Sequence, residues 1–150
     1  MSSMGMKDLK AVTLAAHALA VTAATAGGSG DATEVNGVTL DTAALSARPN
    51  SVLFVVDAKA TLAATKSLTI TANLQDSADG SSWADITDPA VILTLTSAAG
   101  GTEVGVGTLG YDLSRARRYV RIQATPDLSA TGTDTASICG VAVFGGLATA

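Results

Sequence analysis

Catalysis would require a nucleophile and a base, and this sequence offers few of either. Cys139 is the only cysteine and His17 the only histidine among the 150 residues. They lie in different kinds of segment, so we expect them to be far apart, and Cys139 is predicted to be a buried, inert thiol. One cysteine also excludes an intrachain disulfide. Because CxxC, HExxH and P-loop motifs are absent as well, the sequence predicts that the protein is not an enzyme.

Acidic residues cluster around one expected turn. They are Asp76, Asp79, Asp85 and Asp88. Carboxylate oxygens are ligands that Ca²⁺ prefers, but this spacing is not that of an EF-hand loop. The main interpretation is therefore that these aspartates form turns, with a structural Ca²⁺ as the alternative. The glycines of residues 98–110 lack the helix start that a phosphate cradle needs. We predict no cofactor and no metal.

Basic residues are concentrated in one short stretch. Four of the nine lysines and arginines lie there, namely Arg115, Arg117, Arg118 and Arg121. One interpretation is a solvated turn and a polar strand face, and the other is a docking patch that grips an acidic partner through bidentate contacts. Lys7 and Lys10 are further candidate contacts. Trp83 is expected to fill the core, with a ligand platform as the alternative.

The composition limits the class of protein. Apolar residues make up 47% of the chain but aromatic residues only 3%. Small apolar side chains suit stacked sheets or packed subunits better than a deep ligand pocket. A net charge of −4 argues against a general nucleic-acid binder, so no direct nucleic-acid partner is predicted. The alanine-rich run of residues 11–26 is too short and too polar to span a membrane, and no membrane partner is predicted.

The N-terminal 30 residues are expected to differ from the rest. Lysines before an alanine-rich run are also typical of a signal peptide, but Asp8 and His17 interrupt the pattern. Helix propensity favours a helix here, β-branched residues favour an extended arm, and the sequence does not decide between them. Glycines 27, 28 and 30 suggest a flexible joint. We therefore predict an arm and joint over 1–30 and a folded domain over 31–150.

The folded domain is expected to consist of strands. Residues Ser67–Asp76 alternate apolar and polar side chains, as in a half-buried antiparallel strand, and Asp79-Gly80 suits a tight turn. Pro126–Thr133 is expected to be a turn or loop. Other strands are predicted over Val38–Asp41, Ser51–Ala58, Ser82–Ile86, Ala90–Thr96, Glu103–Leu109, Arg118–Thr125 and Thr135–Phe144.

This pattern predicts an all-β fold. About seven or eight strands with turn residues between them are typical of this class. One long sheet would expose its apolar face, so two packed sheets are the economical arrangement. The fold class predicted is a two-sheet antiparallel β-sandwich, jelly-roll-like, with a flexible N-terminal arm. Ser51–Ala58 is expected to be a central strand.

Two segments carry a family resemblance. Residues 67–86, SLTITANLQDSADGSSWADI, and residues 117–146, with a strand of the form RYVR and a final AVFGG, resemble small tailed-phage and prophage virion proteins. Residues 6–14, MKDLKAVTL, are also similar to the openings of such proteins, whereas residues 12–26 are richer in alanine. The resemblance is to β-sandwich head decoration (cement) proteins and implies no catalytic residues.

The resemblance implies a structural role in the virion. Copies of the protein, as trimers, would decorate the exterior of a capsid assembled in the host cytoplasm and bridge neighbouring major capsid subunits. The arm would order on binding, and the arginines would fix the orientation. Two alternatives stay open: a tail or neck component of the virion, and a secreted carbohydrate-binding module with Trp83 and Tyr111 as its platform.

Overall fold

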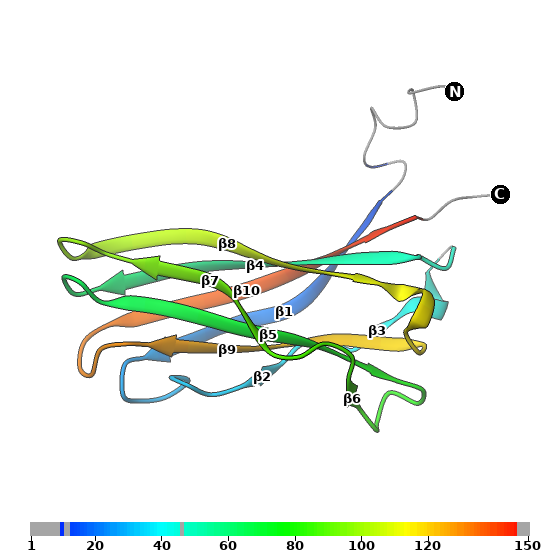
Figure 1. Cartoon of the computed structure of the whole chain (residues 1–150), viewed down its shortest axis with the longest axis horizontal. Helices are drawn as coiled ribbons and strands as arrows, with labels where there is room; N and C mark the ends of the chain where they lie inside the picture. The colour runs from blue at the N-terminus through cyan, green and yellow to red at the C-terminus, as the bar shows by residue number, and fades with distance from the viewer. Residues whose placement is uncertain (1–9, 11–12, 46, 147–150) are drawn as a thin grey trace.

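The computed structural model of the chain describes residues 10, 13–45 and 47–146. Two antiparallel sheets pack face to face in a sandwich (Figure 1). The strands are β1 (Leu14–Thr25), β2 (Val35–Asn36), β3 (Leu40–Asp41), β4 (Ser51–Leu62), β5 (Ser67–Ser77), β6 (Ala84–Asp85), β7 (Ala90–Thr96), β8 (Gly101–Asp112), β9 (Tyr119–Leu128) and β10 (Thr135–Gly145). Two short 3-10 turns, η2 (Thr42–Ala44) and η3 (Leu113–Arg115), complete the described elements.

The strand order is that of a jelly roll. Sheet A has the order β1-β10-β4-β8, and sheet B has the order β2-β9-β5, with β6 and β7 both pairing β5 and β3 pairing β9. The first long strand thus lies beside the last in sheet A, and β2 lies beside β9 in sheet B. This is the connectivity of a long hairpin rolled up on itself. The predicted all-β sandwich with jelly-roll-like connections is confirmed.

The strand predictions for the body hold closely. In β5, Leu68, Ile70 and Leu74 are buried between the sheets, as the alternation predicted. Strand β4 is central in sheet A, between β10 and β8, and extends to Leu62. The two phenylalanines, Phe54 and Phe144, face the interior from sheet A. The remaining core is aliphatic and alanine-rich, so the two layers lie close together.

Glycines on the inner face of β8 allow a close approach of β7. A side chain at Gly107 would place its first carbon 2.8 Å from the backbone oxygen of Ile92 in β7. A side chain at Gly105 would meet Leu95 at 2.7 Å. The glycine-rich passage of the sequence is therefore a packing feature of a regular strand.

The predicted arm is wrong for the residues that the structure describes. Residues 14–25 form β1, an edge strand of sheet A that pairs with β10. Leu19 is fully buried, and Ala18 and Ala24 lie in the core. The register shifts between His17 and Thr22, which breaks the alternation. Because of this irregularity and the small side chains, sequence periodicity could not reveal the strand.

The predicted flexible joint is an ordered turn instead. Thr25 N–H donates to the Ser29 carbonyl at 2.9 Å, and Gly27 N–H donates to Asp31 Oδ2 at 2.7 Å. Asp31 Oδ1 accepts from Leu128 N–H at 2.8 Å, which ties the turn to β9. The Leu128 and Gly27 N–H donors lower the pKa of Asp31 below its usual value. The boundary predicted at residue 30 therefore falls inside the sandwich.

Three smaller predictions differ. The segment Val38–Asp41 is a strand only at Leu40–Asp41, because Val38 N–H instead donates to the Ala18 carbonyl of β1 at 2.8 Å. Pro126 lies within β9 and is buried, so the following loop begins later than expected. The strand at Ser82–Ile86 is reduced to Ala84–Asp85. No helix in the described ranges has the length and apolarity needed to cross a membrane.

Candidate functional site

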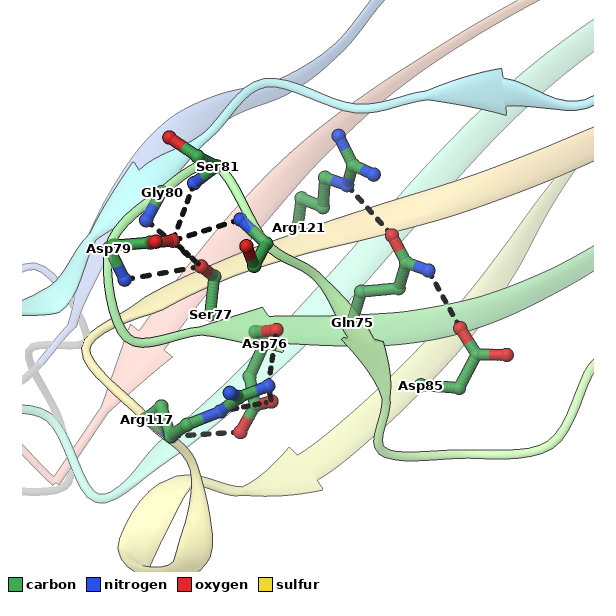
Figure 2. Close-up of polar contacts among 10 residues, drawn as sticks. Gln75, Asp76, Ser77, Asp79, Gly80, Ser81, Asp85, Arg117 and Arg121 are labelled. Carbon is green, nitrogen blue, oxygen red and sulfur yellow. Dashed lines mark hydrogen bonds and ion pairs between the residues drawn. The ribbon is translucent and has the colours of Figure 1, made fainter.

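The turn after β5 is organised by Asp79 (Figure 2). Its Oδ1 accepts hydrogen bonds from Ser81 N–H and Ser82 N–H, both at 2.8 Å, and from the Ser77 hydroxyl at 2.9 Å. Gly80 takes the positive φ of +77° that the turn requires. The N–H donors of Ser82 and Ser81 and the Ser77 hydroxyl lower the pKa of Asp79 to about 2. The carboxylate serves the turn, as the main interpretation predicted.

Asp76 lies beneath this turn and binds Arg117. The carboxylate is 5% exposed, and its Oδ1 receives Arg117 Nη2 at 2.6 Å and Nε at 2.9 Å. The backbone N–H of Arg117 donates to Asp76 Oδ2 at 2.9 Å. Arg117 thereby fixes the loop before β9 to the end of β5 (Figure 2). Because these donors hold the buried carboxylate of Asp76, the contact has a structural role.

The remaining predicted basic residues are placed unequally. Arg118 forms two hydrogen bonds with the Asp41 carboxylate, at 2.9 and 2.8 Å, and this contact lowers the pKa of Asp41. Arg115, at the end of η3, is exposed. Lys10 is exposed, and Lys7 lies outside the described residues. Arg117 and Arg118 thus have intramolecular carboxylate partners, and a docking role for these cations stays a prediction.

Trp83 is not in the core, contrary to the main prediction. Its ring is half-buried, and the Arg121 guanidinium stacks over it at 4.2 Å from the ring centre. Arg121 Nε also donates to Gln75 Oε1 at 2.9 Å, and Gln75 Nε2 donates to Asp85 Oδ1 at 2.7 Å (Figure 2). Burial lowers the pKa of Arg121. The tryptophan covers a polar network.

That network continues across the outer face of sheet B. Asn73 Nδ2 donates to Gln123 Oε1 at 3.0 Å, and both side chains are buried. Gln123 Nε2 donates to Glu34 Oε1 at 2.9 Å and to Asn36 Oδ1 at 2.7 Å. These amide groups satisfy one another and hold β2 and the loop after β5 against the sheet. Little hydrogen-bonding capacity is left for a ligand.

The acidic cluster does not form a cation site. Asp76 accepts hydrogen bonds from Arg117, and Asp79 accepts them from N–H and hydroxyl groups of its turn. Asp85 accepts hydrogen bonds from two side-chain amides. Within the described ranges, no group of three histidine, cysteine, aspartate or glutamate side chains could hold a metal ion. The donor set therefore fits the turn interpretation and offers no basis for the Ca²⁺ alternative.

The outer face of sheet A carries exposed apolar side chains on β4, β8 and β10. Leu53 of β4 and Val141 of β10 are 41% and 43% exposed, and Val104 and Val106 of β8 are 69% and 55% exposed. Val55 and Val143 add half-buried apolar area between them. Asp57 and Lys59 of β4 lie on the same face, opposite Val106 and Val104, so charged residues interrupt its apolar area. Exposed apolar area on a sheet is typical of interaction surfaces. We call this surface the A face.

The A face ends in an open hollow. It has a volume of about 900 Å³ and lies where β4, β8 and β10 meet the loop before β4. Tyr111 lines it but also packs against the core. Tyr111 belongs to sheet A, whereas Trp83 lies beside β5 and β6 of sheet B. The two aromatic rings therefore do not form one platform.

The expectation that His17 lies far from Cys139 is wrong. His17 in β1 is opposite Val141 of β10, two residues from Cys139. Cys139 is half-buried rather than fully buried, and it occupies the A face in register with Asp57 of β4. No hydrogen bond joins His17 and Cys139 in the part of the chain that the structure describes. A catalytic dyad is therefore not formed.

Comparisons with known proteins show the fold. No protein-family model matches the chain, and no curated protein matches it. A chain of the T13 particle of infectious bursal disease virus is 11% identical, with a TM-score of 0.50, and the match covers 88% of this chain and 30% of that one. Further structures of that virus also match. These structural neighbours are therefore viral particle proteins.

Two other solved structures are less similar. The PBSX exported protein XepA is 14% identical, with a TM-score of 0.37, over 85% of this chain and 36% of that chain. The CBM22-1–GH10 part of xylanase 10B from Clostridium thermocellum is 13% identical, with a TM-score of 0.38, over 93% of this chain and 26% of that chain. The chain thus spans about a third of the length of the solved chains it matches. At these identities the likeness shows the fold alone.

Proposed function

We propose that the protein is a structural component of a phage virion that decorates the capsid and stabilises it by bridging neighbouring major capsid subunits. The observation that carries this proposal is the A face, where Leu53, Val141 and the β8 valines are exposed while the opposite face is polar and internally satisfied. The jelly roll is a recurrent fold of viral capsid domains. That likeness is an analogy at the level of fold.

Docking through the A face fits the chemistry of cementing. Burial of apolar area contributes roughly 25 cal/mol per Å², and attachment to several subunits at once multiplies a modest affinity. The face is built from strands, so it is rigid before binding and loses little conformational entropy. Arg115, the exposed last residue of η3, would add an ionic contact that fixes orientation.

The proposal includes the finer features implied by the resemblance. Copies of the protein would lie on the capsid exterior, as trimers at threefold positions, after assembly in the host cytoplasm. The major capsid protein would be the partner, with neither nucleic acid nor membrane in contact.

Two alternatives make different predictions. A tail or neck component would be present in a few dozen copies or fewer per particle, whereas a cement protein would be present in hundreds. A carbohydrate-binding module would need an open aromatic and polar platform, but Trp83 is covered on one side by Arg121 and the polar network of sheet B is internally satisfied. Glycan-array binding would favour that third function.

The test measures occupancy on purified particles. Leu53→Lys and Val141→Lys place a charge in the A face, and Thr94→Lys places the same charge on an exposed position of sheet B. Added to particles that lack the protein, the first two variants should bind at least about tenfold more weakly than wild type, and Thr94→Lys should bind normally. Equal binding by all three variants would contradict docking through the A face.

A further inference from the structure

Strand β8 is an unprotected edge of the sandwich. It pairs with β4 over all 12 of its residues without a register shift, and Figure 1 shows it along one margin of the molecule. The other edge strands are less suited to pairing. Strand β1 is irregular, and its Ala18 carbonyl accepts a hydrogen bond from Val38 N–H. Strands β2 and β6 have two residues each, and β7 pairs with β5 with a register shift. Long regular edges are templates for another strand.

The backbone groups that face outward can be identified. Leu113 N–H donates to the Asn50 carbonyl at 2.9 Å, which continues the β4–β8 ladder by one pair. Backbone direction alternates along an antiparallel strand, so the odd-numbered residues of β8 bond to β4. The even-numbered residues point N–H and C=O away from β4, and β8 pairs with no other described strand. These residues also place their side chains on the A face.

Four of those side chains form a palindrome. The palindrome consists of the first four of the six, Thr102, Val104, Val106 and Thr108, and is symmetric about Gly105. We propose that β8 pairs antiparallel with β8 of a second copy of this chain, around a twofold axis at Gly105. Val104 then lies opposite Val106 of the second copy, and Thr102 lies opposite Thr108 of the second copy. β-Branched pairs of this kind stabilise adjacent strands.

Charge and hydrogen bonding agree with this register. Glu103 is the only charged residue of 101–111, and it falls opposite Gly107 of the second copy, so no like charges meet. Each pair of even-numbered residues exchanges two backbone hydrogen bonds, as in a hydrogen-bonded antiparallel pair. The pairing covers Val104 and Val106, the most exposed side chains of the A face. It also joins the two A faces into one surface.

This contact links two copies, so it cannot by itself build the predicted trimer. It shares Val104 and Val106 with the A face, but the capsid-docking test uses Leu53 and Val141, which lie on β4 and β10, away from the β8 edge. The oligomeric state of the isolated full chain therefore tests the pairing separately from the proposed function.

The experiment is sedimentation velocity over a range of concentrations, with circular dichroism to verify folding. Wild type should show a concentration-dependent dimer. V104K/V106K places like charges opposite each other and should weaken dimerisation at least about 100-fold. V104E/V106K places each glutamate opposite a lysine of the second copy, lies beside Lys59 and Asp57 of β4 with opposite charges, and should restore the dimer. The controls Val21→Lys and Val91→Lys change exposed valines of β1 and β7 and should leave it intact.

Several outcomes would overturn the pairing. They are a wild-type chain that stays monomeric at all concentrations, a dimer that tolerates V104K/V106K, and a trimer as the only assembled species. Failure of V104E/V106K to restore the dimer would reject the Gly105-centred register. If wild type is monomeric and the β8 variants fail to attach to particles, the edge would pair with a capsid strand instead. The proposed function would then still stand.

Discussion

Asp79 stabilises a single turn, and its ionisation should change the thermal stability of the protein. Its pKa in the folded chain, about 2, lies below the ordinary value of 3.8, so the stabilisation is fully present above pH 3.8 and is lost as the pH falls toward 2. Asp79→Ala should therefore lower Tm by a few degrees at pH 7, and the difference from wild type should become small as the pH falls to 2. Thermal unfolding monitored between pH 2 and 7 measures both effects.

The matched control for this prediction is Asp88→Ala, which removes an exposed aspartate after the same hairpin. Its Tm at pH 7 should stay close to that of wild type. A Tm difference for Asp79→Ala that persisted unchanged down to pH 2 would show that the carboxylate is not the group responsible.

Asp76 and Arg117 should be coupled energetically. Arg117→Met leaves the buried carboxylate of Asp76 without its guanidinium partner, which should cost about 1–3 kcal/mol of unfolding free energy because Arg117 is itself 43% exposed. Asp76→Asn combined with Arg117→Met should cost less than the sum of the single changes. Urea denaturation of the four proteins gives the coupling, and Arg115→Met, at an exposed position, should change little. Additive effects on the free energy of unfolding would mean that Asp76 and Arg117 are not coupled.

At the scale of elements, β1 decides how much of the N-terminal segment is dispensable. Deleting residues 1–9 removes none of the described strands and should leave a folded domain. Deleting 1–26 removes β1 with buried Leu19, exposes the edge of β10 and should abolish cooperative unfolding. Leu19→Ala should cost about 2–5 kcal/mol, whereas Val21→Ala, at a 74% exposed position, should cost less than about 0.5. A folded 1–26 deletion would restore the idea of a detachable arm.

Most strands could be predicted from the sequence, whereas β1 could not, for a physical reason. Regular alternation over Ser67–Asp76 and Arg118–Thr125 predicted β5 and β9, because one face of each strand is aliphatic and the other is polar. Strand β1 was missed because alanine serves equally on both faces and a register shift after His17 interrupts the period. Local patterns also cannot report that β10 lies beside it.

The candidate surface was missed for a related reason. In the first half of β4 both faces are apolar, and the run SVLFVV predicted only a central strand. Its outward half, Leu53 and Val55, is instead part of the A face. The alternation of glycine with valine and threonine in β8 was the available signal, since glycines face the interior and β-branched residues face outward. In the predicted arginine patch, Arg117 and Arg118 instead bind the carboxylates of Asp76 and Asp41.

At the scale of the whole molecule, the two outer faces differ in how far their side chains are already bonded to one another. The outer face of sheet B holds its amides and carboxylates in internal bonds, so it gains little from a partner and suits contact with water. Among the described residues, the A face has fewer side-chain hydrogen bonds, and its apolar part gains free energy when it is covered. A molecule with one such face binds in one orientation, which is what attachment to a shell requires.

Cys139 offers a direct measurement of that orientation. As the only cysteine, half-buried on the A face, it should react with a maleimide in the isolated protein and be protected at least about tenfold on particles that carry the protein. A Cys139→Ser protein with Thr94→Cys provides the matched reporter on sheet B, and this thiol should react at the same rate in both states. Pairing through β8 alone should leave the Cys139 rate unchanged, because Cys139 lies on β10 and the β8 edge lies on the far side of β4. Protection of the Thr94→Cys reporter with free reaction of Cys139 would reverse the proposed orientation, since it would place sheet B against the shell.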